Sequence, residues 1–409
     1  MLKFTSFKSI ISKEHISNNL INLSSIERIF EESYVFCHKV FGFKSTKNSS
    51  TSLKTVKINS INDDIYIETK ISKINNKKVK FENILIVSSG IKESKIGTRV
   101  FEVNEDFETL QKNTKVFNKK LNFYSSYKGI VRTEECDQMY HMNVQFYFDK
   151  QSKALKNFTN HIFKNISFKI KSERCIFYKE VHEFSALEIV IFVKNLKKNH
   201  LTLQSKLYCT SKHYVSAYFE TEISFESDAK QIFKAVDSLL QKKQNTFVND
   251  FNFIKLRKIR PFRILKKPSE NSIITCKKAS NTWDLDFDGY ATHRFLISCV
   301  SDAATQLFTK CGVNHKWRAD YQIGSAALDY IVRYYNYPTI GMAVSLKSNF
   351  IEVNEKSFKF CHHLIDDASN RVLMDIQIVA VLFDLKKRVA IKLPNSFRKK
   401  AEALLIKNQ

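Results

Sequence analysis

Two stretches of the chain carry the same pattern 149 residues apart. Each combines a turn rich in carboxylates with a following apolar helix. Sliding the sequence by that offset places Asp286 on Asp137, Gly289 on Tyr140, Tyr290 on His141 and Ala303 on Ala154. An internal repeat of this kind predicts two copies of one folding unit. The chain of 409 residues is long enough for two to four units with their own cores.

The first of these stretches, Val131–Leu155, predicts a short strand, a polar turn and a largely buried helix. Asn143 is suited to cap the helix, because its side-chain oxygen can accept an amide hydrogen of the first turn. Asp137 and His141 stand just before that helix start. The free N–H groups and partial positive charge of a helix N-terminus suit an anion or a polarised carbonyl.

Residues 135–147, ECDQMYHMNVQFY, resemble the active-site turn of hotdog-fold acyl-CoA thioesterases. The family pattern runs Asp, two residues, usually Gly, then His, Met or Val, Asn and an aromatic-rich helix. This chain departs from it once, with Tyr140 in place of the Gly. The resemblance implies an α+β fold of tandem hotdogs, in each of which a curved antiparallel sheet wraps a long central helix. We expect two clear hotdogs and a further, degenerate one at the N-terminus.

The periodicity predicts where these units lie. The second unit, 121–227, should contain the strands 174–178, 187–194, 201–210 and 214–225. The third, 271–395, should contain a helix over 292–310 capped by Thr292, and the strands 324–335, 343–353, 357–365, 372–384 and 388–393. The first, 1–110, should contain a helix over 24–43 capped by Ser24 or Ser25, and the strands 52–59, 64–74, 78–88 and 98–103.

The N-terminal residues allow two interpretations, and the segments outside the three units are a linker and a tail. Residues 1–13 have the composition of a mitochondrial presequence without Arg, or form a first strand over 7–11. The first unit has Ser17 or Ile16 where the acid would stand, so we expect it to be catalytically silent. Residues 228–270 form a helical and then basic linker, and 396–409 a C-terminal tail.

The charge of the chain points to an anionic partner. Sixty-six basic residues stand against 41 acidic ones, a formal net charge of +25. CoA phosphates, RNA or an anionic membrane face would suit this surplus. The basic segment 255–268, KLRKIRPFRILKKP, could clamp phosphate or contact an RNA backbone, or could simply be a solvated linker.

Cysteine spacing and hydropathy narrow the class further. The eight cysteines include no C-x-x-C pair, which favours free thiols in a reducing, intracellular compartment over disulfides or a zinc site. No run approaches the roughly twenty apolar residues of a transmembrane helix. The resemblance calls for no metal and no cofactor, since the CoA thioester is itself the substrate.

The resemblance also assigns roles. Asp137 would act as general base or nucleophile, and His141 and Asn143 would orient water or the carbonyl. The backbone N–H groups at Val144 and Gln145 would polarise the thioester carbonyl. Arg174 and Glu180 would face the site of the paired hotdog, with Asp286 and Glu180 as secondary catalytic candidates.

Each of these residues also has a structural interpretation. Asp137 could be an ordinary turn residue. Asp286, crowded by Asp284 and Asp288, favours a solvated acidic turn. Arg174 and Glu180 could form a surface ion pair. Three histidines, His293, His362 and His363, favour structural roles.

Two functional classes follow. The first is an acyl-CoA thioesterase in which the second and third units pair within the chain. The second is a former thioesterase recruited into a large basic assembly, such as a mitochondrial ribosome or respiratory complex. A hotdog dehydratase is a lesser third, because it would need a better-placed His. An unpaired first unit would favour a homo-oligomer or docking onto another protein.

Overall fold

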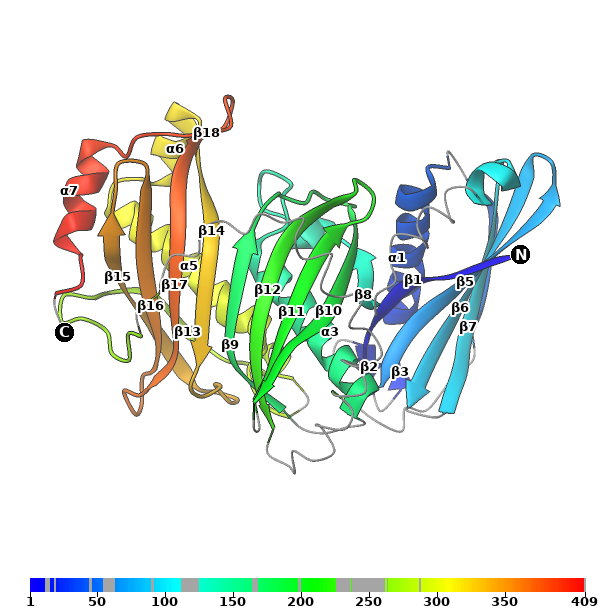
Figure 1. The fold of residues 1–409 in the computed structure, drawn as a ribbon, viewed down its shortest axis with the longest axis horizontal. Helices are drawn as coiled ribbons and strands as arrows, with labels where there is room; N and C mark the ends of the chain where they lie inside the picture. The colour runs from blue at the N-terminus through cyan, green and yellow to red at the C-terminus, as the bar shows by residue number, and fades with distance from the viewer. Residues whose placement is uncertain are drawn as a thin grey trace.

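The computed structural model describes residues 1–11, 15–17, 20–43, 46–53, 63–89, 92–111, 125–163, 168–197, 200–225, 236, 262, 264–286 and 288–407. Three similar units stand in a row along the molecule (Figure 1). The predicted linker helix over 228–243 lies outside the described residues apart from Val236. The same holds for residues 255–261 and 263 of the basic segment.

The first unit consists of one strand, then a helix, then four further strands. Its elements are β1 (Leu2–Ile10), α1 (Leu23–Phe41), β4 (Thr46–Leu53), β5 (Asp64–Asn75), β6 (Lys78–Ser89) and β7 (Lys92–Val103), with a two-stranded ribbon of β2 (Ile16–Ser17) and β3 (Leu20–Ile21) between β1 and α1. The N-terminal residues therefore form a strand of the sheet. The helix is capped by Asn22, whose Oδ1 accepts the Ser25 amide at 2.7 Å, and not by Ser24 or Ser25 as predicted.

The second unit repeats this order. Its elements are β8 (Ser125–Ile130), α3 (Val144–Phe163), β9 (Phe168–Phe177), β10 (Ala186–Lys197), β11 (His200–Cys209) and β12 (Tyr214–Phe225). The short strand predicted at the start of Val131–Leu155 is wrong: β8 ends at Ile130 and a 3-10 turn occupies Thr133–Glu135. The turn forms because the Glu135 carboxylate accepts the Arg132 amide at 3.0 Å.

The third unit has the same plan with two added helices. Its elements are β13 (Ile273–Ala279), α5 (His293–Lys310), α6 (His315–Tyr321), β14 (Ile323–Tyr334), β15 (Ala343–Val353), β16 (Ser357–Asp366), β17 (Val372–Asp384), β18 (Val389–Ala390) and α7 (Asn395–Ala403). Thr292 caps α5 as predicted, accepting the Phe295 amide.

One prediction at the C-terminal end is wrong, and the expected tail is partly helical. The strand expected over 388–393 shrinks to the two residues of β18, because Asp384 accepts the amides of Lys386 and Lys387 and turns the chain. The expected tail contains α7, which buries Phe397 and Ala401 one helical turn apart. Its other side chains are mostly polar, so the apolar period was too weak to read from the sequence.

One continuous sheet joins the three units. Its strand order is β13-β15-β16-β17-β14-β9-β12-β11-β10-β8-β1-β5-β6-β7-β4. Within each unit the first strand lies at one edge and the second at the other, with the last three between them. This order, and a helix between the first two strands, recurs in all three units. The fold is therefore α+β, a tandem array of hotdogs, and the first unit shares its topology.

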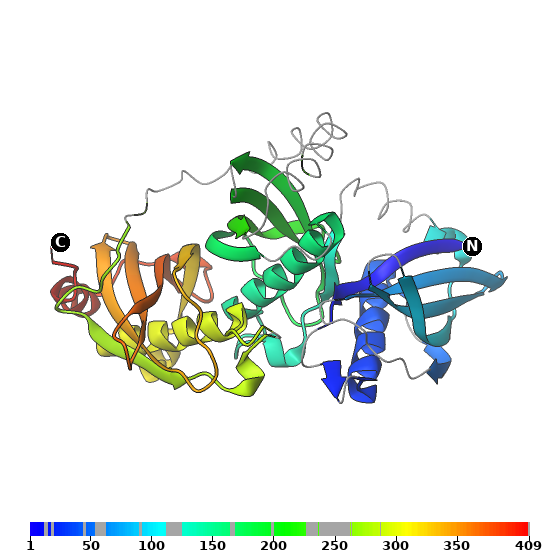
Figure 2. The ribbon, with the colours of Figure 1, turned by 90° about the horizontal axis from the view of Figure 1, so that it is seen from below.

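The units meet in two different ways. Second strands pair in antiparallel fashion between the second and third units, where Arg174 of β9 lies opposite Ile331 of β14. First strands pair between the first and second units, where Lys8 of β1 lies opposite Lys128 of β8. Helices α3 and α5 pack together on the same face of the sheet (Figure 2). A shared hydrophobic core therefore runs through the second and third units.

The first unit keeps apolar clusters of its own. Ile130 and Ala186 of the second unit join one of them, which extends the core across that boundary too. Among the described helices, none combines the length and the apolar character needed to span a membrane.

Candidate active site

The turn before α3 is closed by the Asp137 side chain. Its Oδ1 accepts the backbone amides of Met139 at 2.9 Å and His141 at 3.1 Å. The Asp137 amide in turn donates to the His141 carbonyl at 2.8 Å. Asp137 is exposed to solvent. One carboxylate oxygen is therefore committed to holding the turn, and Oδ2 makes no hydrogen bond or ion pair within the described part of the chain.

The same turn stands before α5. Asp286 Oδ1 accepts the amides of Asp288 at 3.0 Å and Tyr290 at 3.1 Å. The difference lies in the other oxygen, because Lys156 Nζ approaches Asp286 Oδ2 at 3.5 Å. Both aspartates thus act as turn residues, which was the structural interpretation of each. Only Asp137 keeps an oxygen without a partner among the described residues.

The departure at Tyr140 has a clear backbone consequence. Tyr140 adopts φ 59°, and Gly289, its counterpart, adopts φ 81°. A glycine reaches this left-handed region without strain, whereas a tyrosine does not. The Tyr140 side chain is 65% exposed, so its ring does not fill the space in front of α3.

Asn143 caps α3 as the sequence predicts. Its Oδ1 accepts the Gln145 amide at 3.2 Å, and its carbonyl accepts the Phe146 amide at 3.0 Å. Ser301 of α5 donates to the same Oδ1 at 3.5 Å. The amide of Val144, the first of the helix, finds no acceptor within the described residues. This N–H is the one available to polarise an oxygen at the positive end of the helix.

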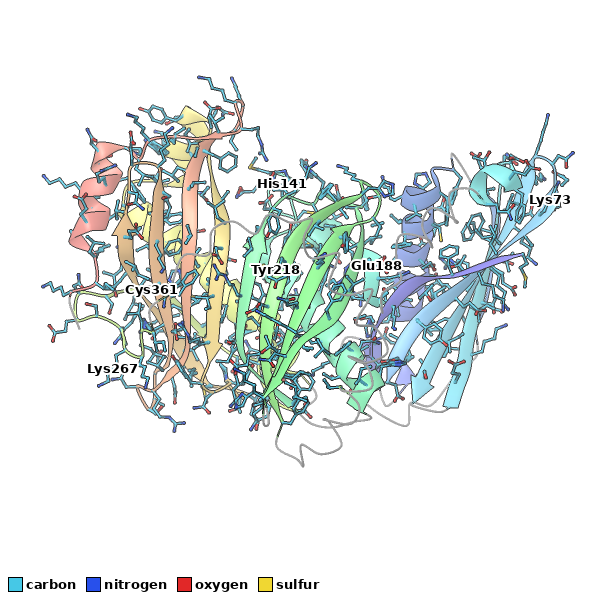
Figure 3. The ribbon with its side chains drawn as sticks, in the orientation of Figure 1. Lys73, His141, Glu188, Tyr218, Lys267 and Cys361 are labelled. Atoms are coloured by element: carbon cyan, nitrogen blue, oxygen red, sulfur yellow. The ribbon has the colours of Figure 1, made fainter. Side chains whose placement is uncertain are left out.

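His141 lies at the end of the second unit that adjoins the third (Figure 3). Its Nδ1 is 3.6 Å from Glu180 Oε1, and its ring meets that of His182 edge-on, with centroids 4.6 Å apart. Burial and the charge of His141 lower the pKa of His182. Arg388 of the third unit binds the other Glu180 oxygen. The structure therefore brings Glu180 to His141 and adds Arg388, which sequence reasoning missed.

A buried ionic network supports the turn from behind. Glu135 is paired with Lys150 at 2.8 Å and with Arg132 at 3.1 Å. Burial raises the pKa of Glu135, but the attraction of Lys150 and Arg132 outweighs it, so the pKa lies below its usual value. Arg132 also lies 3.7 Å from Glu32 of α1, which links the first unit to this turn. The sequence signal for this network was Lys150, a lysine among the residues that α3 buries.

Arg174 does not join the site. It projects from the face of β9 opposite to its neighbour Glu173, which contacts α5, and its guanidinium binds the Asp329 carboxylate. Phe262 stacks on it at 5.2 Å. The predicted ion pair between Arg174 and Glu180 is therefore wrong, because Arg174 pairs with Asp329 and Glu180 pairs with Arg388. The described end of the basic segment packs against this outer face of the sheet, since the Leu265 carbonyl also lies 2.8 Å from His363 Nε2.

The three histidines that were predicted to be structural, His293, His362 and His363, are packed among other side chains. His293 Nδ1 lies 3.1 Å from the fully buried Glu173, and its ring stacks on Tyr334. His362 is buried beside Ser348, and burial lowers its pKa to about 3. All three are buried, in keeping with structural roles. Among the described residues no group of three or more His, Cys, Asp or Glu could hold a metal ion.

A family model for the thioesterase-like superfamily matches residues 131–242 and 280–401, more than half of the chain. The chain belongs to the thioesterase-like superfamily. The two matched segments coincide with the two turns and helices described above, and the first unit lies outside them. The resemblance of residues 135–147 to this group of thioesterases is confirmed.

Several solved hotdog thioesterase structures are similar to this superfamily member. A protein described as an oleoyl thioesterase from Lactobacillus plantarum is 11% identical, with 67% of this chain and 98% of that chain covered and a TM-score of 0.49. An acyl-ACP thioesterase from Bacteroides thetaiotaomicron is 11% identical, with 62% and 96% covered and a TM-score of 0.44. The 12:0-ACP thioesterase from Umbellularia californica is 6% identical, with 63% and 96% covered and a TM-score of 0.46. No curated protein matches the chain.

Proposed function

We propose that this protein hydrolyses acyl-CoA to a free acid and CoA, at the turn before α3. One observation carries the proposal: Asp137 keeps an unpaired carboxylate oxygen in the same turn whose next helix offers the free Val144 amide. Its counterpart in the third unit, Asp286, has a lysine on that oxygen. The superfamily membership supplies the reaction class.

The roles follow from what each group can do. Asp137 serves as general base for water, or attacks the thioester carbon itself. The carbonyl oxygen gains charge as the C–O bond forms, and the Val144 amide donates to it at the positive end of α3. The C–S bond then breaks. If Asp137 acts as base, the leaving thiolate takes up the proton that Asp137 removed from water; if Asp137 attacks, water hydrolyses the resulting acyl-aspartyl anhydride to the free acid and supplies that proton. His141 and Asn143 orient the water or the carbonyl, and Glu180 holds His141.

The proposal also covers the acyl carrier, the cofactors and the cellular compartment. CoA is the proposed carrier, and the reaction as drawn needs no metal or redox cofactor. All eight cysteines are free thiols, which suits an intracellular, reducing compartment.

A second candidate function rests on the charge. A net charge of +25 is more than one CoA binding site requires, and Tyr140 and Tyr290 stand where the family pattern has Gly and His. A catalytically silent subunit of a large basic assembly, such as a mitochondrial ribosome or respiratory complex, would suit these features, with residues 255–268 as a candidate RNA contact.

Hydrolysis of a panel of acyl-CoA and acyl-ACP substrates tests the proposal. Asp137→Asn keeps the oxygen that accepts the two turn amides and removes the charge, so the fold should persist while turnover falls by about 100-fold or more. Asp286→Asn, the matched change in the third unit, should retain nearly the wild-type rate. Full activity in Asp137→Asn would refute the assigned role.

The two candidate functions separate cleanly. A well-folded wild type that turns over none of the panel would favour the silent subunit. Gel filtration of the native protein then decides, because an assembly subunit should elute at the size of a very large particle and a free enzyme should not.

A further inference from the structure

The third unit has an open groove along its first strand. The groove encloses about 550 Å³ between β13 and α5, and its charged lining consists of Lys277, Lys278, Lys310 and Asp302. β13 is the terminal strand of the sheet and has one strand neighbour within the described part of the chain. Ile274 on this strand is 50% exposed. An unpaired edge beside an open groove is a surface prepared for another strand.

The internal repeat shows which element binds the equivalent groove of the second unit. By the 149-residue offset, Lys277 corresponds to Lys128 and Gln306 to Asn157. In the second unit both positions contact the first unit: Lys128 lies opposite Lys8 of β1, and Asn157 Nδ2 donates to Asp64 Oδ1 at 2.8 Å. The groove that is open in the third unit is therefore filled by a neighbouring hotdog in the second.

The filled groove is built almost symmetrically. β1 and β8 run antiparallel, α1 packs on β8, and α3 packs on β1. Asn157 of α3 reaches the Ser9 carbonyl of β1 at 3.4 Å, while Glu32 of α1 lies against Gly129 of β8. Each hotdog thus offers its first strand and its helix to the other. Contacts that use the same surface on both sides are those of a twofold axis.

We infer that the β13–α5 groove is where a second copy of this chain binds, across a true twofold axis, with β13 of one copy beside β13 of the other. The first unit cannot fill this groove in the same molecule, because its own first-strand face is already taken by the second unit. The inference does not depend on the proposed thioesterase activity.

The charges give this dimer a distinctive salt dependence. The groove carries three lysines and one aspartate, so two copies face each other with like charge. Lys8 opposite Lys128 shows that such a contact is tolerated within the chain, where Glu188 lies 3.5 Å from Lys128. No acid stands at the corresponding place in the third unit, where Ser345 pairs with Lys277. Salt should therefore strengthen the dimer by screening the repulsion.

Sedimentation equilibrium of the full chain, in about 50 and about 500 mM NaCl, tests this. We expect a dimer that tightens at the higher salt. Thr305→Arg places a long cation in the groove and should weaken dimerisation by about tenfold or more. Thr282→Arg, at an exposed threonine that does not line the groove, should leave it unchanged. A wild type that stays monomeric, or a dimer indifferent to Thr305→Arg, would overturn the inference.

A mixing experiment removes the dependence on any one variant. The double variant K277E/K310E reverses the charge of the groove. Mixed with wild type at low salt it should form heterodimers in preference to either homodimer, since opposite charges then meet across the axis. Homodimers in statistical proportion would show that the grooves do not face each other.

Discussion

Lys150 Nζ lies 2.8 Å from the carboxylate of Glu135, and both side chains are almost fully buried, 2% and 0% exposed. Lys150 belongs to the second turn of α3, and Glu135 also accepts the Arg132 amide and, through its carbonyl, binds the Asn143 amide. The pair thus fastens the helix to the turn that carries Asp137. The third unit has Cys299 and Asp284 at these positions, so it lacks this ion pair.

Lys150→Met should destabilise the protein by about 3 kcal/mol, because it leaves the Glu135 charge buried with Arg132 alone. Urea unfolding followed by circular dichroism measures the change. The double variant Glu135→Gln, Lys150→Met should recover much of the loss, since no charge then remains unpaired. Lys194→Met, which breaks a half-exposed pair with Glu220, should cost far less. Equal losses for Lys150→Met and Lys194→Met would contradict this account.

Asp64, at the boundary between the first two units, should make a pH-dependent contribution to the stability of the protein. Burial raises the pKa of Asp64 to about 6, although the charge of Lys8 opposes the rise, and Asp63 adds to it. The raised pKa means that the folded protein binds this proton more tightly than the unfolded chain. Its stabilising effect is fully present below about pH 4 and is lost as the pH rises through about 6.

Asp64→Asn should therefore be more stable than wild type at pH 7, by about 1 kcal/mol after allowance for solvent screening. The difference should vanish below about pH 3, where Asp64 is protonated in both the folded and the unfolded state. Urea unfolding at a series of pH values provides the test. The asparagine retains an oxygen for the Asn157 amide, so packing stays comparable. Parallel pH profiles for the two proteins would show that Asp64 does not titrate in this way.

Tyr140 and Gly289 occupy equivalent positions in the two turns, and both have a positive φ. Opposite substitutions at the two positions can therefore be compared. Tyr140→Gly should stabilise the protein by about 0.5–1 kcal/mol by removing strain from the left-handed backbone. Gly289→Ala should destabilise it by about 1 kcal/mol, and through backbone strain alone, because nothing lies within 4 Å of the added methyl group. Thermal melts of the two variants should shift in opposite directions. Shifts of the same sign would mean that the turns are not equivalent.

Local features were predictable from the sequence because their causes are local. The caps at Asn143 and Thr292 bind amides within the next three residues, and the aspartates at 137 and 286 close turns of five residues. The 149-residue repeat was visible because these local turn and cap residues recur in both stretches. The cap of α1 was missed because Asn22 stands two residues before the expected Ser24, and Asn22, Ser24 and Ser25 are all good caps.

Long-range contacts were not predictable. Arg388 reaches Glu180 across 208 positions of sequence, and His293 meets Glu173 only because β9 and β14 pair in one register. Strand order and register decide which side chains meet, and a one-residue slip would send each to the other face. Arg174 illustrates this, since it lies on the opposite face from Glu173.

Glu180 offers the sharpest test of the assembled site. Its carboxylate lies 3.6 Å from His141 Nδ1 and is held from the third unit by Arg388. Glu180→Gln keeps the shape and removes the charge that fixes the imidazole, so we expect kcat for acyl-CoA hydrolysis to fall by about tenfold with KM little changed. His141→Ala and Glu180→Gln together should cost no more than His141→Ala alone, because Glu180 acts through the imidazole. Glu183→Gln, in the same loop but bound to Thr133, is the matched control and should keep the wild-type kcat. Additive losses in the double variant would separate Glu180 from His141 and leave the carboxylate a purely structural link between the two units.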